Sequence, residues 1–497
     1  MSNLDHTLPS PLSDIAQNSS ALLGLTIAWH PDLDRVGEQF IGGNSAGTLE
    51  VSRFLPLFAK PQNSGLSLGH GGISRDPVRI VRGADDGLDI HPPSSKMVVE
   101  INGTQIFGAT HLTREDVDAG VVLDLGRTVL ICLHWMRCLP KNNPVPGYIG
   151  VGNNAIKTRD LIRQAAANES AVLLLGETGT GKEVAASAIH HMSARASAAL
   201  VCVNMAALNE SLAAADLFGA VKGAYTGAHA ARKGFFSEAQ NATLFLDEIG
   251  NAPASVQPML LRVLESGEYR PLGAAHDERS SARLISATDQ DIYHDAFNQA
   301  LLRRLESFII PIAPLRARRE DIGLLMVSML RATSLADSIL PAPLVSRFIN
   351  HDWPGNVRQL SHVLKRVLQT MQSGDIPLFD ALVNTQPIRV TQSGTPISEA
   401  GRKPSEPPRK KLADISEEDV LRAMDNSHWT IQAAAEELGI SRPSMYKLID
   451  AHTQIRRAAD ISPEEIRQTL EANAFDVERC AAVLKTPYEA LRRQLQR

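Results

Sequence analysis

The stretch AVLLLGETGTGKE, residues 171–183, decides the fold of the central part of the chain. It opens with an apolar run typical of a buried strand, continues as a glycine-rich turn, and leads into helix-forming residues after Lys182. Strand, glycine turn and helix in this order are the pattern of a P-loop, in which backbone N–H groups and the positive end of a helix surround phosphate oxygens. The stretch therefore predicts an α/β domain that binds a nucleotide.

The side chains of this loop suggest ATP as the ligand. Lys182 is expected to reach the β- and γ-phosphates. It is followed by Glu183, where the general pattern has a Ser or Thr hydroxyl for Mg²⁺. The residues predicted to bind ATP in the loop are Gly176, Glu177, Thr178, Gly179, Thr180, Gly181, Lys182 and Glu183.

A second run, TLFLDEIG (243–250), delivers Asp247 and Glu248 side by side at the end of a predicted strand. Asp247 is placed to hold Mg²⁺, directly or through water, and Glu248 to polarise a water for attack on the γ-phosphate. Two acids after a strand are a weak sign alone. Together with the P-loop they predict an ATPase.

The sequence on either side of these motifs divides the chain further. Between about 155 and 374, strand-like runs alternate with amphipathic segments of helix length, which is typical of a parallel sheet with crossover helices. From about 23 to 135, short apolar runs broken by Gly, Pro, Asn and Asp predict an all-β sandwich. Segment 384–411, rich in Pro, Ser and basic residues, predicts a mobile tether.

The tail contains an internal repeat. One copy begins at Ile415 and the other at Ile461, an offset of 46 positions, and the apolar positions of the two copies coincide. Each copy predicts a first helix opened by a Ser-x-x-Asp/Glu capping box, then two shorter helices joined by a tight turn. The repeat therefore predicts two copies of one helical unit.

Composition limits the functions that the chain can have. With 497 residues, 43% hydrophobic and 21% charged, it is expected to be a globular protein of about three domains. Its net charge of -5 argues against bulk attraction to nucleic acid, so DNA binding must be local. The absence of a secretory signal and of a run of about 18 apolar residues predicts a cytoplasmic protein without membrane contact. Its 4 cysteines form no CxxC pair, which argues against a disulfide framework or structural metal.

Four motifs together resemble one family. GETGTGKE, GAYTGA (223–228), LFLDEIG and WPGNVRQL (353–360) are similar to the central AAA+ domain of sigma-54-dependent transcriptional activators, the bacterial enhancer-binding proteins. The resemblance implies an AAA+ ATPase with a small helical lid, a homo-oligomeric ring that is a hexamer in the family, and sigma-54 RNA polymerase holoenzyme and double-stranded DNA as partners. It also implies a surface loop that contacts sigma-54, made of Gly223, Ala224, Tyr225, Thr226, Gly227 and Ala228.

Further site residues follow from the same resemblance. It implies that Asn204 restrains Glu248, that Arg358 is the second sensor of the nucleotide, and that Arg304 reaches across the subunit interface. Asp289 stands where the family's first sensor normally ends in Asn, and Asn298 replaces the first of two trans-acting arginines. An arginine finger is worth on the order of a thousandfold in turnover. The departures therefore keep open a DNA-binding repressor or anti-activator that uses ATP only to oligomerise, and a non-transcriptional AAA+ remodeller is a second rival.

The tail resembles a Fis-type helix-turn-helix on the segment GISRPSMYKLID. In such a unit the second helix enters the major groove of DNA. The residues that this places on DNA are Arg442, Ser444, Tyr446 and Lys447. The second copy has Lys485 where the first has Gly439, and it is either a further DNA reader or a packing and dimerisation unit.

The amino-terminal sandwich resembles a forkhead-associated (FHA) domain, which reads phosphothreonine. The resemblance rests on Arg53, Ser74, Arg75 and Asn102, and it implies a phosphothreonine protein as partner. Pro77 occupies the place of the family's structural His. The alternative is a scaffold that no longer binds phosphopeptide.

The expected chain is therefore multidomain. Its predicted parts are an FHA-like β-sandwich over 20–137, an α/β P-loop AAA+ domain with a helical lid over 148–378, a linker over 379–413, a Fis-type helix-turn-helix over 414–452, and a second, degenerate copy over 460–497.

Overall fold

The computed structural model forms two compact units that divide between His362 and Val363. None of the helices in the described part of the chain has both the length and the apolar content to span a bilayer. The structure describes residues 21–42, 47–225, 229–293, 297–333, 340–373, 377, 379–383, 417–427, 429–438, 445, 448–449, 452, 454–473 and 476–495.

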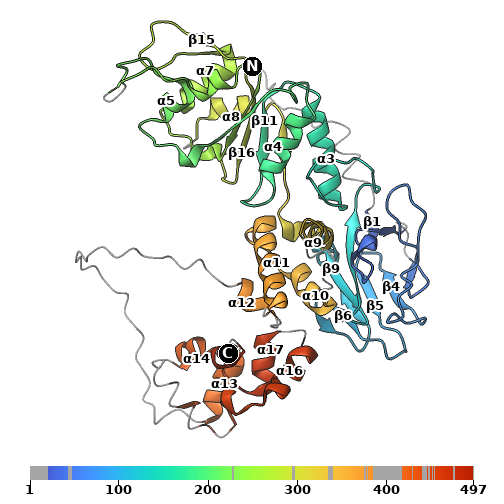
Figure 1. The fold of residues 1–497 in the computed structure, drawn as a ribbon. Helices are drawn as coiled ribbons and strands as arrows, with labels where there is room; N and C mark the ends of the chain where they lie inside the picture. The colour runs from blue at the N-terminus through green and yellow to red at the C-terminus, as the bar shows by residue number, and fades with distance from the viewer. Residues whose placement is uncertain are drawn as a thin grey trace, which may run out of the picture. The chain divides into compact units, whose positions relative to one another are not determined.

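The amino-terminal region is a sandwich of a six-stranded and a four-stranded sheet (Figure 1). Inner-face residues of both sheets, such as Ile27 and Ile80, meet in one hydrophobic core, which confirms the predicted all-β region. Asn102 and Gly103 have φ angles of 50° and 78°, as the turn between β6 and β7 requires. The elements are β1 (Leu22–Trp29), β2 (Gln39–Ile41), β3 (Thr48–Val51), β4 (Val78–Arg82), β5 (Leu88–His91), β6 (Val99–Ile101), β7 (Thr104–Gln105), β8 (Thr110–Leu112), α2 (Arg114–Ala119), β9 (Val121–Leu125) and β10 (Val129–Met136).

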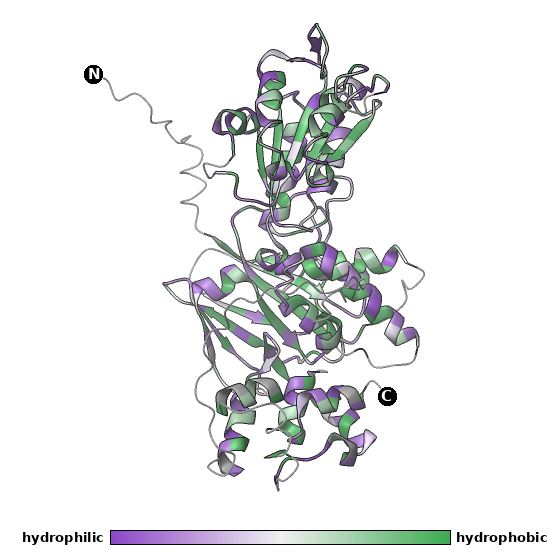
Figure 2. Ribbon diagram, turned by 90° about the vertical axis from the view of Figure 1, so that its left-hand side faces the viewer, coloured by the Kyte–Doolittle hydropathy of each residue, from purple (hydrophilic) through white to green (hydrophobic). Residues whose placement is uncertain are grey.

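The central region is a five-stranded parallel sheet in the order β12-β13-β16-β11-β17, as predicted. Because side chains alternate along a strand, Leu174 of β11 packs toward α3 and α4, whereas Leu173 packs in the core that contains α5, α7 and α8. Figure 2 shows hydrophobic residues running through these strands. The elements are α3 (Asn153–Ala166), β11 (Val172–Leu175), α4 (Lys182–His191), β12 (Leu200–Asn204), α5 (Ala213–Phe218), α6 (Phe235–Glu238), β13 (Thr243–Asp247), α7 (Gln257–Ser266), β14 (Glu268–Tyr269), β15 (Glu278–Arg279), β16 (Arg283–Thr288), α8 (Gln299–Leu305) and β17 (Ile309–Pro311).

Helices follow the sheet and make the lid. Helices α9 and α10 pack against strand β1 of the sandwich, and α10 also packs against β9 and β10. The contact is close at Gly323, where an added Cβ would lie 1.7 Å from the carbonyl oxygen of Ala28 in β1. The helices are α9 (Ile322–Arg331), α10 (Ala342–Asn350), α11 (Asn356–Gln372) and α12 (Phe379–Val383). Helix α12 occupies the start of the segment predicted as linker, because Phe379 is apolar and buried there.

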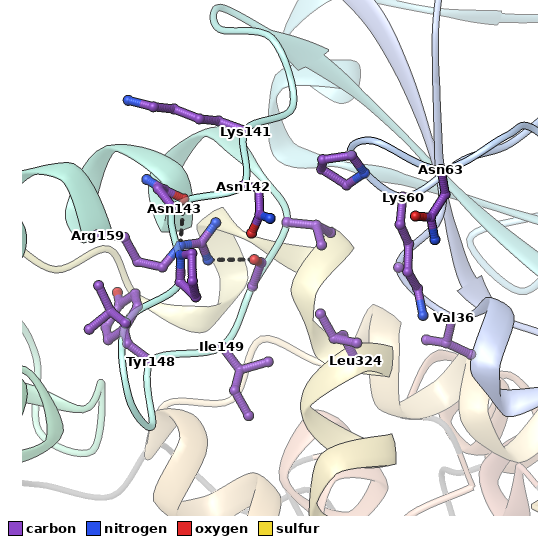
Figure 3. Close-up of a pocket in the computed structure, with 16 residues that line it drawn as sticks. Val36, Lys60, Asn63, Lys141, Asn142, Asn143, Tyr148, Ile149, Arg159 and Leu324 are labelled. Atoms are coloured by element: carbon purple, nitrogen blue, oxygen red, sulfur yellow. Dashed lines mark hydrogen bonds between the residues drawn. The ribbon is translucent and has the colours of Figure 1, made fainter.

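The connection between sandwich and central sheet is fixed by Arg159 of α3. This buried side chain donates from Nε to Asn143 Oδ1 (2.9 Å) and from a terminal nitrogen to the carbonyl oxygen of Gly150 (2.5 Å). Figure 3 shows these bonds beside a cavity of about 520 Å³ lined also by Val36 of the sandwich and Leu324 of α9. Arg159 thus holds the connecting segment, residues 137–152, at two points within the first unit.

Two adjacent acids, Glu320 and Asp321, are buried just before α9. Asp321 Oδ1 accepts hydrogen bonds from the backbone N–H groups of Val151 (2.6 Å) and Gly152 (3.0 Å). Burial raises the pKa of Glu320 to about 8, and the neighbouring carboxyl of Asp321 raises it in the same direction. Glu320 is therefore protonated at neutral pH in the folded chain.

This burial predicts a pH-dependent stability. The folded state keeps a proton on Glu320 that the unfolded state releases near pH 4.5, so the free energy of unfolding should fall as pH rises from about 4.5 to about 8. In Glu320→Gln this fall should be shallower by the contribution of this one carboxyl, whereas Asp124 and Asp321, whose pKa values burial also raises, keep theirs. Urea unfolding of both proteins across this pH range measures the two slopes, and equal slopes would contradict the prediction.

The tail folds around one core. Met424 and Trp429 of the first copy and Leu470 and Leu491 of the second belong to a single hydrophobic cluster. The N–H of Tyr488 donates to the carbonyl oxygen of Trp429 at 2.9 Å, which links the copies directly. The helices are α13 (Glu417–Asn426), α14 (Ile431–Leu438), α16 (Pro463–Ala472), α17 (Val477–Leu484) and α18 (Tyr488–Gln494). Ser462 caps α16 by accepting from the N–H of Glu465, as predicted.

Lys485 ends α17 in the left-handed conformation, with φ 48° and ψ 51°. This conformation costs a residue with a Cβ about 1–2 kcal/mol, whereas glycine adopts it without that strain but loses more backbone entropy on folding. Lys485→Gly should therefore stabilise the tail by about 0.5–1 kcal/mol. Native-state hydrogen exchange at the α17 amides of the full chain measures the gain. Lys485→Ala, which keeps the Cβ, is the matched control and should give no such gain.

Candidate nucleotide-binding site

The predicted P-loop lies between β11 and α4, with Lys182 at the first position of the helix. Lys182 is buried, and its Nζ donates to the carbonyl oxygens of Gly176 (2.7 Å) and Glu177 (3.2 Å). Burial lowers the pKa of Lys182, and the carboxylates of Asp289 and Asp247 oppose that shift. The lysine thus faces acids from the ends of β16 and β13, because parallel strands end at one edge of the sheet.

Glu177 ties the loop to the segment before the lid. Its carboxylate accepts two hydrogen bonds from Arg316 (2.8 and 2.5 Å) and one from Asn356 Nδ2 (3.2 Å). The Arg316 guanidinium lowers the pKa of Glu177. Asn356 Oδ1 also accepts the N–H of Leu315 at 2.7 Å. Glu177 therefore has a structural partner on the lid side. The sequence does not point to this role of Asn356, although the residue lies inside WPGNVRQL.

The start of α11 brings Arg358 to the P-loop. The N–H of Val357 donates to the carbonyl oxygen of Gly179 at 3.0 Å. Gly179 has φ 79°, and a Cβ on it would lie 2.4 Å from the oxygen of Gly355 and 3.1 Å from Arg358 Cβ. Glycine is required here both by the backbone angle and by the close approach of the lid.

The two acids at the end of β13 are arranged differently from each other. Glu248 is in the left-handed conformation (φ 53°, ψ 45°), and its N–H donates to Asp247 Oδ1 at 3.0 Å. One carboxylate oxygen of Glu248 accepts from Asn251 Nδ2 at 3.1 Å. A non-glycine residue in this conformation is uncommon and is found often at active sites. The turn brings the Glu248 carboxylate to the side chain of Asn251, three residues later.

Asn204 lies next to Asp247 in the register of β12 and β13. Its Oδ1 accepts the N–H of Ala206 at 2.9 Å and caps the following turn. Among the hydrogen bonds of the described residues, the side chain that holds Glu248 is Asn251 rather than Asn204. Asn251 was not predicted from the sequence, because no motif singles it out.

Thr178 of the P-loop meets the first-sensor position. Its Oγ1 donates to Asp289 Oδ2 at 2.5 Å. Asp289 therefore faces the loop, where it contributes a carboxylate instead of the amide that the family normally has. The negative charge of Asp289 also favours the protonated form of Lys182, and so opposes the lowering of the lysine pKa by burial.

The residues of the predicted subunit edge lie on α8. Asn298, which replaces the family's first arginine, caps this helix by accepting from the N–H groups of Ala300 and Leu301, each at 3.0 Å. Arg304 is exposed and bonds Glu265 at 3.1 Å. Arg303 is exposed beside Arg304, and both arginines line a cavity of about 570 Å³. Asn298 therefore has a helix-capping role in place of the charge.

The predicted sigma-54 loop emerges from a short antiparallel pairing. Ala220 and Arg232 exchange backbone hydrogen bonds of 2.9 and 2.8 Å at its base. Gly223 has φ 80°, and Ala224 and Tyr225 are half-buried. Thr226, Gly227 and Ala228 lie outside the described residues, as do the four residues predicted to contact DNA, Arg442, Ser444, Tyr446 and Lys447.

The acids fit a magnesium ion bound with ATP. Mg²⁺ prefers oxygen ligands and is usually held by one or two carboxylates together with phosphates and water. Asp247 offers such a carboxylate, whereas Glu183 is exposed at the second position of α4. In the part of the chain that the structure describes, no group of three or more His, Cys, Asp or Glu side chains forms a metal cage. The phosphates would therefore supply part of the coordination.

In the sandwich, three of the predicted phosphopeptide residues lie together. The Arg53 side chain donates to the carbonyl oxygens of Ile73 (2.9 Å) and Gly71 (2.6 Å), and its backbone N–H donates to the carbonyl oxygen of Ser74 (2.9 Å). Arg75 follows Ser74 and is exposed. The Ser74 hydroxyl accepts the N–H of Asp76 (2.9 Å).

Asn102 lies elsewhere. Its Oδ1 accepts the N–H of Val122 at 2.8 Å, at the opposite end of β6 from Met97. Met97 Sδ accepts the N–H of Ser74 at 3.2 Å, so the segment beside the predicted site is 94–97. The Ser94 hydroxyl donates to Asp76 (2.6 Å), a contact that was not predicted from the sequence.

Comparisons with known proteins cover the central and terminal parts. Residues 148–311 match the Sigma-54 interaction domain, 316–386 the AAA+ ATPase lid domain, and 411–451 the Bacterial regulatory protein, Fis family. The chain is 36% identical over 322 residues to the anaerobic nitric oxide reductase transcription regulator NorR of Vibrio vulnificus, covering 60% of this chain and 62% of that one. It is 37% identical over 293 residues to the Nif-specific regulatory protein of Klebsiella pneumoniae, covering 57% and 54%.

A third relative is matched over almost its whole length. The chain is 32% identical over 322 residues to the Psp operon transcriptional activator of Escherichia coli, covering 61% of this chain and 97% of that one. Among solved structures, it is similar to NtrX from Brucella abortus in complex with ADP, with 24% identity and a TM-score of 0.43 over 61% of this chain and 68% of that one. The chain thus spans less than two thirds of the first two relatives and nearly all of the third.

Proposed function

The chain belongs to the family of sigma-54-dependent transcriptional activators with a Fis-type DNA-binding domain, and from this premise we propose that it uses ATP hydrolysis to remodel the sigma-54 RNA polymerase closed complex. It would bind DNA upstream of the promoter, in the cytoplasm. The observation that carries the proposal is the topology of the sheet: the P-loop follows β11, Asp247 and Glu248 stand at the end of β13, and Asp289 follows β16, so all lie at one edge of the same parallel sheet.

The roles of the residues follow from their positions. Lys182 and the loop amides would bind the phosphates of ATP, and Asp247 would hold the Mg²⁺ that neutralises their charge. Glu248 would take the proton of the attacking water. Arg358, beside Gly179, would contact the nucleotide from the lid.

A ring of subunits would complete the site. Arg304 is exposed on α8, and in one subunit it contacts Glu265 at the surface. Such a surface ion pair is weak, so the guanidinium can be released toward a neighbouring phosphate. We propose that the arginine acts across the interface, and that the hairpin from Ala220 to Arg232 carries the resulting movement to sigma-54.

The proposal is tested by open-complex formation with sigma-54 polymerase on a promoter with its upstream DNA. Wild type should open the promoter in the presence of ATP, Glu248→Ala should fail, and Thr226→Ala should hydrolyse ATP without opening it. Intact DNA binding with ATPase activity near zero would instead favour the repressor or anti-activator. Failure to bind any promoter-upstream DNA would favour the non-transcriptional remodeller.

We further propose that the sandwich is an FHA-like reader of phosphothreonine. Arg53, Ser74 and Arg75 lie together at one end of the sandwich, and arginine forms strong charge-assisted bonds to phosphate. Asp76 adds a carboxylate nearby, which would weaken the site. Calorimetry of the full chain with a threonine peptide and its phosphorylated form tests this. Equal heats for the two, or no loss of binding in Arg75→Ala, would contradict it.

The second tail copy supports a proposal of its own. The two copies would form a tandem helix-turn-helix body, because their helices share one core. The first copy would read DNA and the second would support it.

A further inference from the structure

Two side-chain amides connect Glu248 to the end of β16. Asn251 Nδ2 donates to Glu248 Oε2 at 3.1 Å, and Gln290 Nε2 donates to Asn251 Oδ1 at 2.8 Å. The N–H of Gln290 donates to Thr288 Oγ1 at 3.1 Å, which anchors this glutamine to the strand end. We call Asn251 and Gln290 the amide relay. Its two side-chain hydrogen bonds both donate in the direction of Glu248, from Gln290 to Asn251 and from Asn251 to the acid.

The backbone of residues 248–251 allows the hydrogen bonds of the amide relay to form. Asn251 ends a short turn in which its N–H donates to the carbonyl oxygen of Glu248 at 2.9 Å, so its side chain folds back onto the acid. Gly250 lies between them, and a Cβ there would be 2.9 Å from both Gln290 Oε1 and Thr288 Oγ1. Glycine therefore lets Gln290 approach Asn251.

A neutral amide is a suitable partner for a general base. It fixes one carboxylate oxygen by a hydrogen bond and brings no charge that would strongly lower the basicity of Glu248. The other oxygen is left to meet a water. Asn204, which the resemblance assigns to this task, uses its Oδ1 to cap the turn at Ala206.

The far end of the relay lies next to the P-loop. Gln290 follows Asp289, whose carboxylate accepts the hydrogen bond of Thr178. A phosphate that enters the loop would compete with Asp289 for the hydrogen bond of the Thr178 hydroxyl. A movement of Asp289 would then shift Gln290, the next residue in the chain and a member of the relay. The orientation of Glu248 is in this way coupled to the occupancy of the loop.

We infer that Asn251, held by Gln290, is the positioning residue for Glu248 in ATP hydrolysis, and that the amide relay couples this acid to the first-sensor position. The inference rests on the proposed ATPase function and goes beyond it, because it assigns the positioning role to a residue outside the family's motif.

The test compares three variants of the full chain. Asn251→Ala should lower kcat by about 10- to 100-fold, with little change in KM or in the affinity for a fluorescent ATP analogue, because only the orientation of the base is lost. Gln290→Ala should give a smaller loss of the same kind. Asn168→Ala removes a half-buried amide just after α3 and is the matched control, with wild-type kcat expected.

A second comparison asks whether the amide donor itself is needed. Asn251→Asp replaces the N–H donor with a carboxylate that repels Glu248, so kcat should fall at least as far as in Asn251→Ala, again with little change in KM. Asn251→Gln keeps an amide donor and should recover part of the lost turnover.

The outcomes separate the two claims. Wild-type kcat in Asn251→Ala or in Asn251→Asp would overturn the inference and leave the proposed function standing. Loss of ATP binding in Asn251→Ala would also overturn it, by showing a role in the fold of the loop. A wild-type chain that binds ATP without turnover would remove the proposed function and the inference with it.

Discussion

Replacing Glu248 with Gln is expected to lower ATP turnover by at least about a hundredfold, because general base catalysis contributes about 10²–10⁴-fold. Glutamine keeps the length of the side chain and can still accept the amide hydrogen of Asn251, but it cannot take the proton of the attacking water. ATP affinity should stay within about threefold, because the phosphates are bound by the loop and Lys182 rather than by this acid.

Steady-state hydrolysis and nucleotide titration of the full chain measure these two effects. Glu238→Gln, which changes an exposed acid on α6, is the control and should hydrolyse ATP at the wild-type rate. If Glu248→Gln hydrolyses ATP normally, the base is another group, and the left-handed turn at this residue has a structural purpose only.

The second large effect is expected from Gly323→Ala. The added methyl group would lie 1.7 Å from the carbonyl oxygen of Ala28, and both atoms belong to backbone-fixed positions that cannot yield by a side-chain rotation. Overpacking of this kind typically costs about 1–3 kcal/mol, so helix α9 and strand β1 should separate or the whole first unit should lose that stability.

Limited proteolysis at the connecting segment 137–152, together with thermal unfolding, distinguishes these two results. Gly108→Ala is the matched control, because a Cβ there has no atom within 4 Å. Unchanged proteolysis and unchanged unfolding of Gly323→Ala would show that the sandwich does not rest on α9 in solution.

The sequence predicted those parts of the fold that local pattern controls. The apolar run before Gly176 and the run before Asp247 are both strands of one parallel sheet, as predicted. Such strands can be predicted because their periodicity and the glycine turns that follow them depend on consecutive residues. The same holds for the sandwich and for the cap at Ser462. These features need no knowledge of distant contacts.

Contacts between distant residues could not be predicted in this way. Arg316 and Glu177 are far apart in sequence, and their pairing depends on how the segment before the lid passes the P-loop. The contact of Gly323 with Ala28 depends on two different regions packing together. No period or spacing encodes either of them.

At the sites, residue type was a better guide than exact position. Asn102 and Gly103 form the turn between β6 and β7, and this places Asn102 at the opposite end of β6 from the loop around Ser74. Asn204 lies beside Asp247, but Asn251 holds Glu248. A motif names a kind of side chain, and only packing determines which of several similar side chains makes the contact.

The two copies of the tail share a single hydrophobic core, so the packing of each copy depends on the other. A substitution at Trp429 or Leu491 is expected to disturb the packing of both copies, because both side chains belong to the shared core. A chain truncated before the last helices is therefore expected to expose apolar side chains of the first copy to water, and with them a surface prone to self-association.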